Sequence, residues 1–107
     1  GTFVAKNLAD GQMAATKTTM LTASSATLYI KFFSCVNAGT TNETIIIYYK
    51  KSAGTSRIIG RAVLGAGEQA RFIDKDETLI LENGDIIEGI TTTATTVDFV
   101  IAGISET

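Results

Sequence analysis

Side chains branched at Cβ are the feature that most limits how this chain can fold. The 107 residues include 17 Thr, 13 Ile and 5 Val, so 35 of them are β-branched. Such side chains lose rotamer freedom in a helix but pack well on a pleated sheet. Breaks containing Gly, Asn or Ser separate short apolar runs at intervals of about a dozen residues, which is typical of a sandwich or barrel. We therefore expect one all-β domain.

The strand predicted most clearly covers residues 26–37. Four of its apolar residues alternate with mainly polar ones and are expected to face the core: Leu28, Ile30, Phe32 and Val36. The opposite face carries Tyr29, Phe33 and Cys35 beside Lys31. Because a fully solvated face rarely holds two aromatic rings, we expect this face to be partly covered, either by the N-terminal segment or by another subunit.

Further strands are predicted over residues 44–51, 57–64, 68–74 and 97–104. The pair Asn83-Gly84 lies between two apolar runs and tolerates positive φ at both centres of a tight turn, so residues 79–87 are predicted to form a β-hairpin. Seven or eight strands result. Two packed antiparallel sheets fit this number better than a single open sheet, which would leave an apolar face in water.

The first eleven residues show no alternation. Residues 1–11 are therefore interpreted as an N-terminal arm and residues 12–107 as a single β-sandwich domain, the alternative being that the arm is a frayed end. Phe3, Val4 and Leu8 are its large apolar residues.

The composition excludes much of enzyme chemistry. The chain has no His and a single cysteine, Cys35, so it has no Ser-His-Asp or Cys-His pair, no internal disulfide and no zinc site built from cysteine pairs and histidine. In its apolar strand, Cys35 is expected to be a buried and inert thiol. The acidic run Asp74–Glu77 lacks the pattern of a calcium loop and is interpreted as a solvated turn. We expect no enzyme activity, no cofactor and no metal.

The charge pattern argues against nucleic acid as a partner, and the length of the apolar runs argues against a membrane. Nine basic and eleven acidic residues are scattered without a basic stripe, and the longest apolar runs fall far short of the roughly 20 residues that span a bilayer. Arg57, Arg61 and Arg71 are interpreted as scattered surface charge, the alternative being a patch that pairs with carboxylates of an adjacent subunit. The N-terminal residues lack the order of a secretory signal, so synthesis in the cytoplasm is expected.

Five sequence phrases occur in an order that resembles a known family: LADGQM, TLYIKFFSCVNAG, GTSRIIGR, LGAGEQARF and LILENGDIIEGITTTATTVDFVIAGISE. The order is similar to that in small β-sandwich structural proteins of tailed bacteriophages and prophages. The likeness extends over nearly the whole chain after residue 7. It differs from the family pattern at Phe32-Phe33, two adjacent aromatic residues in one strand.

The resemblance implies a jelly-roll-like sandwich and a place in the virion. Within that class, a capsid decoration or cement protein is favoured, bound to the capsid surface and bridging capsomers through the major capsid protein, with a homotrimer as the favoured oligomer. A tail, collar or fibre-associated subunit is the alternative. A carbohydrate- or host-surface-binding module is a further one, although sugars stack on exposed Trp or Tyr, and the chain has no Trp and only Tyr29, Tyr48 and Tyr49, all within strands.

The candidate contact residues follow from these expectations. Phe3, Val4 and Leu8 of the arm are the candidates for contact with the capsid. Tyr29 and Phe33, on the face expected to be covered, are the candidates for the interface between subunits.

Overall fold

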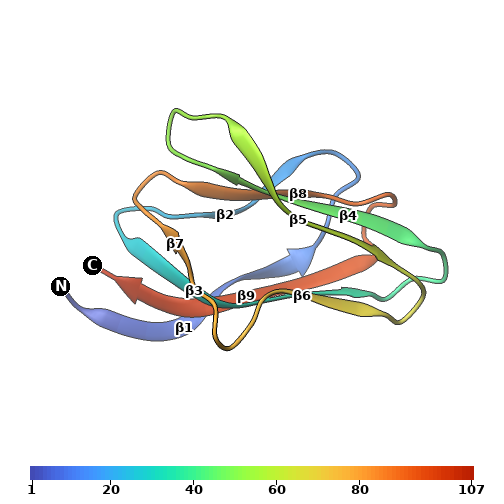
Figure 1. The fold of residues 1–107 in the computed structure, drawn as a ribbon, viewed down its shortest axis with the longest axis horizontal. Coiled ribbons are helices and arrows are strands. Elements are labelled where there is room, and N and C mark those ends of the chain that lie inside the picture. The colour runs from blue at the N-terminus through green and yellow to red at the C-terminus, as the bar shows by residue number, and fades with distance from the viewer.

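The computed structural model describes all 107 residues and shows two antiparallel sheets packed face to face (Figure 1). It contains no helix, and thus none long and apolar enough to cross a membrane. The nine strands are β1 (Phe3–Gln12), β2 (Thr18–Thr22), β3 (Thr27–Asn37), β4 (Glu43–Lys50), β5 (Ser56–Leu64), β6 (Gln69–Ile73), β7 (Leu79–Leu81), β8 (Ile86–Ile90) and β9 (Val97–Glu106).

The strand order is that of a jelly roll. Sheet A has the order β1-β9-β3-β6, with β7 also paired to β3, and sheet B has the order β2-β8-β4-β5. The antiparallel pairs β1–β9, β2–β8, β3–β6 and β4–β5 are nested, as in a long hairpin rolled into two sheets. The predicted antiparallel β-sandwich is therefore confirmed, with nine strands in place of seven or eight.

The segment interpreted as an arm is part of the sandwich. Strand β1 pairs with β9 from Phe3 to Gln12, and the register shifts at Leu8. An edge strand is exposed on both sides, and a bulge reverses the alternation of its side chains, so no regular pattern is visible in the sequence. Strand β2 is also short and irregular, with a register shift at Met20, and the sequence carries no clear signal for it.

A bulge in β3 changes which of its residues face the core. The register against β9 shifts between Ile30 and Phe32, so that Leu28 and Ile30 are buried before it and Phe33 and Cys35 after it. The predicted core positions of Phe32 and Val36 and the predicted outer positions of Phe33 and Cys35 were wrong for this reason. Beside the bulge, Gly103 lies so close to β3 that a Cβ atom there would collide with the carbonyl oxygen of Tyr29.

The predicted hairpin at Asn83-Gly84 was also wrong. Strand β7 belongs to sheet A and β8 to sheet B, so the turn between them passes from one sheet to the other. Only Gly84 has positive φ, at 92°, and the Asp85 N–H donates to the Glu82 carbonyl at 2.9 Å. The dipeptide marks a tight turn, but the sheet that each flanking strand joins is decided by distant partners.

The strands predicted over residues 44–51, 57–64, 68–74 and 97–104 are confirmed as β4, β5, β6 and β9. Alternate residues of β9 from Val97 to Ile101 are buried, and in β4 Ile45 and Ile47 are fully buried while Ile46 is half-buried. Strand β5 has a register shift at Ile59, next to Gly60. The core between the sheets holds 15 residues: Met13, Leu21, Ala23, Leu28, Ile30, Phe33, Cys35, Ile45, Ile47, Leu64, Leu81, Ile87, Val97, Phe99 and Ile101.

Candidate functional site

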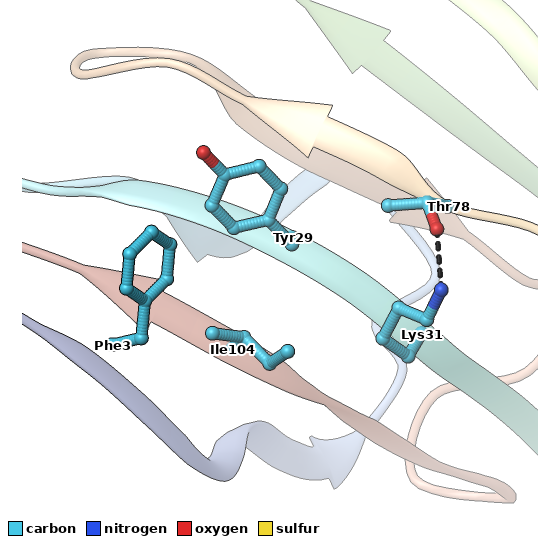
Figure 2. A pocket seen from close by; sticks show the side chains of 5 residues that line it. All are labelled: Phe3, Tyr29, Lys31, Thr78 and Ile104. Atoms are coloured by element: carbon cyan, nitrogen blue, oxygen red, sulfur yellow. Dashed lines mark hydrogen bonds between the residues drawn. The ribbon is translucent and has the colours of Figure 1, made fainter.

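The outer face of sheet A carries an open hollow, hereafter the sheet A hollow, with a volume of about 250 Å³. Figure 2 shows the five side chains that line it: Phe3, Tyr29, Lys31, Thr78 and Ile104. They come from β1, β3, β9 and the residue that precedes β7. It is the only pocket in the molecule.

Strand register explains why these residues meet. Ile104 pairs with Tyr29 on one side and with Ala5 on the other, and directly opposed residues in antiparallel strands share a face. Tyr29 is also paired with Ile80 of β7, which extends the row across the sheet. Phe3 lies one row away, and its ring centroid is 6.3 Å from that of Tyr29. The hollow therefore has an aromatic and aliphatic floor assembled from the three strands β1, β3 and β9.

Polar groups stand at the rim of the hollow. The Tyr29 hydroxyl donates to Glu106 Oε1 at 2.6 Å, and this hydrogen bond, with smaller contributions from desolvation and from the charge of Glu106, raises the pKa of Tyr29. Lys31 Nζ donates to Thr78 Oγ1 at 2.6 Å. Neither the Glu106 carboxylate nor the Lys31 ammonium group has an ionic partner, because the one ion pair in the chain is Lys51–Glu82. The hollow is therefore suited to binding an apolar group, and its own charged side chains, Glu106 and Lys31, lie at its edge.

The structure brings some of the candidate residues together and separates others. Phe3 and Tyr29 meet in the sheet A hollow, although the sequence assigned them to different contacts. Val4 is 48% exposed but lies opposite Ser105, on the other side of β1 from Phe3, and Leu8 packs against the core. Phe33 is fully buried and cannot contact a subunit, so its assignment was wrong, and the bulge in β3 is the cause.

A second exposed apolar surface lies on β5. Ile58 and Val63, which are 62% and 60% exposed, lie with Arg61 on the outer face of sheet B. The three residues are opposite Tyr48, Ile46 and Thr44, whose neighbours in β4 point into the core. We call Ile58, Arg61 and Val63 the β5 stripe. The sequence predicts a strand here, but its exposure follows from its place at the edge of sheet B.

The sheet edges are poorly suited to adding another strand. Strands β1, β2 and β5 each contain a register shift, and the fourth edge is divided between β6 and β7. Bulges and short edge strands are common protections against edge-to-edge pairing. Contacts with other molecules are therefore expected on the faces of the sheets.

Two fully buried carboxylates hold loops in place. Asp85 accepts hydrogen bonds from the Ser52 N–H at 2.9 Å, the Tyr49 hydroxyl at 2.8 Å and the Glu82 N–H at 3.0 Å. Burial raises the pKa of Asp85, but these hydrogen bonds outweigh burial, so the pKa lies below its ordinary value. Asp85 thus ties the β7–β8 turn to the β4–β5 turn.

Glu43 does the same at the other end of the sandwich. Its Oε1 accepts from the Thr91 hydroxyl and the Thr93 N–H, both at 2.8 Å. Burial raises the pKa of Glu43, but the hydrogen bonds from the threonine loop bring it below its ordinary value. Because both carboxylates are enclosed, their role is to fix the loops.

The acidic run Asp74–Glu77 forms a turn closed by its own groups. Glu77 Oε1 accepts from the Asp74 N–H at 3.0 Å, and Asp74 Oδ1 accepts from the Lys75 N–H at 2.8 Å. Nowhere in the molecule do three or more Asp, Glu or Cys side chains lie close enough together to hold a metal ion.

Cys35 is fully buried, and its Sγ lies 3.9 Å from the Met13 Sδ. Burial raises the pKa of its thiol to about 12. Because the thiolate is the reactive form, we expect a thiol reagent such as DTNB to label the native protein only at the rate of unfolding, and the urea-unfolded chain at once. Rapid labelling of the native protein, with its circular dichroism unchanged, would contradict the buried position of Cys35.

Comparisons with known proteins found no matching family model, no matching curated protein and no matching solved structure. The resemblance to phage structural proteins therefore stays a prediction from the sequence.

Proposed function

We propose that this protein is a non-enzymatic structural subunit of a tailed-phage virion, bound to the capsid surface as a decoration or cement protein. The observation that carries the proposal furthest is the sheet A hollow, an apolar contact site on a sandwich whose edges are blunted. The jelly-roll order that the resemblance implies is further support. Cys35 and the two loop-fixing carboxylates are enclosed, which favours binding over catalysis as the use of the surface.

Small contact surfaces are sufficient for such a role. A capsid presents many equivalent sites, and a subunit or oligomer that touches two capsomers at once gains effective concentration for its second contact. Phe3, which is 62% exposed, and the neighbouring Tyr29 are the anchors that the structure offers on sheet A. A tail, collar or fibre-associated position would use the same kind of contact and is the alternative within this proposal.

Capsid occupancy tests the role of the hollow. Removing residues 1–10 would delete most of β1 and expose β9, so a point substitution is the better probe. We expect the Phe3→Ser variant to bind in smaller amounts than the unchanged protein to capsids from which this protein is absent. The substitution removes an exposed apolar anchor but no core contact. The measurement is co-sedimentation with capsids of the phage that encodes the chain.

The matched control is Val100→Ser, on the same face of sheet A but outside the hollow. This variant is expected to bind as the unchanged protein does. Equal binding of Phe3→Ser and the unchanged protein would contradict the hollow as the contact surface. Failure of the unchanged protein to bind would contradict the capsid as its partner.

One observation favours a carbohydrate-binding module as a second candidate. Tyr29 lies within a strand, as expected, but its ring faces the open hollow beside Phe3, with Lys31 and Thr78 nearby (Figure 2). Its hydroxyl donates to Glu106. Aromatic rings with polar groups at the rim suit a sugar ring as well as a protein side chain. A glycan array with a clear signal that Tyr29→Ala abolishes would favour this candidate over the structural one.

A further inference from the structure

We propose that the sheet A hollow receives the β5 stripe of a second copy of this chain, in a head-to-tail contact. The inference builds on the proposed structural role and names the partner of the hollow. Its two halves, the hollow and the stripe, belong to opposite outer faces of the sandwich, so one copy cannot bring them together within itself.

The shapes and apolar surfaces of the two halves fit each other. Ile58 and Val63 are among the most exposed large apolar side chains of the molecule, and they project from an edge strand. The hollow is the one concave apolar surface, and its volume of about 250 Å³ has room for a branched aliphatic side chain. Insertion of Ile58 would cover Phe3, which is exposed to the same extent.

Charge is complementary as well. Glu106 at the rim of the hollow and Arg61 in the β5 stripe both lack an ionic partner within the chain. The outer face of sheet A carries three acidic and two basic residues, Asp10, Asp98 and Glu106 with Lys31 and Arg71. That of sheet B carries Lys50 and Arg61 with Glu88. The excess charge is acidic on the outer face of sheet A and basic on that of sheet B, which favours contact between unlike faces.

The charge of Arg61 disfavours contact between two β5 stripes. Two stripes placed together would oppose Arg61 to its own copy, whereas the hollow offers it Glu106. A contact between unlike surfaces is heterologous, and repeating it produces a closed ring or an open filament. The proposed structural role calls for a closed ring, because a ring is a finite unit that can occupy a site on a particle.

Mixing two variants tests the contact. Phe3→Asp blocks the hollow and Ile58→Asp blocks the stripe, and because each residue is 62% exposed, both variants should keep the fold. Sedimentation velocity is expected to show an oligomer for the unchanged protein and a single-chain mass for each variant. A mixture of the two variants is expected to form a dimer with one copy of each, because one intact hollow and one intact stripe remain.

A control and a charge exchange sharpen the test. Val4→Asp changes an exposed residue on the other side of β1 and is expected to keep the oligomer. Arg61→Glu is expected to weaken association, and combining it with Glu106→Arg is expected to restore it. Circular dichroism confirms that each variant is folded.

Three results would overturn the proposal. They are a single-chain mass for the unchanged protein at every concentration, an oligomer that persists in folded Phe3→Asp or Ile58→Asp, and a mixture that stays monomeric. Occupancy on particles is measured separately. A chain that is monomeric in solution but present on capsids would therefore refute this contact and leave the proposed function standing.

Discussion

Replacing Phe33 with Ala is expected to lower the free energy of unfolding by about 3–5 kcal/mol, the usual cost of truncating a buried aromatic side chain. Phe33 is fully buried, and its ring centroid lies 5.5 Å from that of Phe72. The loss would be a large part of the total stability of a domain, which is about 5–15 kcal/mol. Urea denaturation followed by circular dichroism measures it.

The neighbouring residue provides the matched control. Phe32 follows the same bulge but points to the opposite face of sheet A, where it is half-buried, with the Arg71 guanidinium 4.6 Å from its ring centroid. We expect Phe32→Ala to cost about 1 kcal/mol, the scale of a partly exposed cation–π contact. A larger loss for Phe32→Ala than for Phe33→Ala would mean that β3 continues without a bulge.

Replacing Asp85 with Ala is the second change with a large expected effect. It leaves the Ser52 and Glu82 N–H groups and the Tyr49 hydroxyl without their acceptor in a buried site. Each unsatisfied buried group costs about 1–3 kcal/mol, so a total loss of about 3 kcal/mol or more is expected. Asp98→Ala is the control, because Asp98 is exposed and receives one hydrogen bond, from Gln12. Equal losses for the two variants would refute the role given to Asp85.

The same carboxylate predicts how stability depends on pH. The folded pKa of Asp85 is below its ordinary value, because its hydrogen bonds outweigh burial, and an unfolded Asp has a pKa of about 3.9. Its contribution is therefore complete above about pH 4 and is lost as the pH falls through the folded pKa. Unfolding midpoints in urea, measured from neutral to acid pH, should fall less steeply for Asp85→Asn than for Asp98→Asn.

The strands missed in the sequence are β1 and β2, two edge strands that each contain a register shift. Strand β9 keeps one phase along its inner face from Val97 to Ile101, and its partner strands adjust to it through bulges. A bulge is visible only against the partner strand, so the reversal between Ile30 and Phe33 could not be read from β3 alone. Asn83-Gly84 likewise marks a turn without specifying which sheets it joins.

Two of the five residues that line the candidate site could be predicted as contact residues, but their assembly could not. Phe3 is apparent as an exposed apolar residue of the predicted arm, and Tyr29 as an aromatic residue on a face expected to be covered. Their meeting depends on β9 lying between β1 and β3, a pairing of the two chain ends with the first third of the sequence. The β5 stripe needs the same non-local information, because its exposure depends on β5 being an edge strand.

The position of the chain on an intact particle tests the central claim most directly. A cryo-electron microscopy map of the virion of the encoding phage is predicted to show copies of this sandwich on the capsid, with the sheet A hollow of each covered by protein. A particle without this chain, or one in which every hollow is open to solvent, would contradict the account.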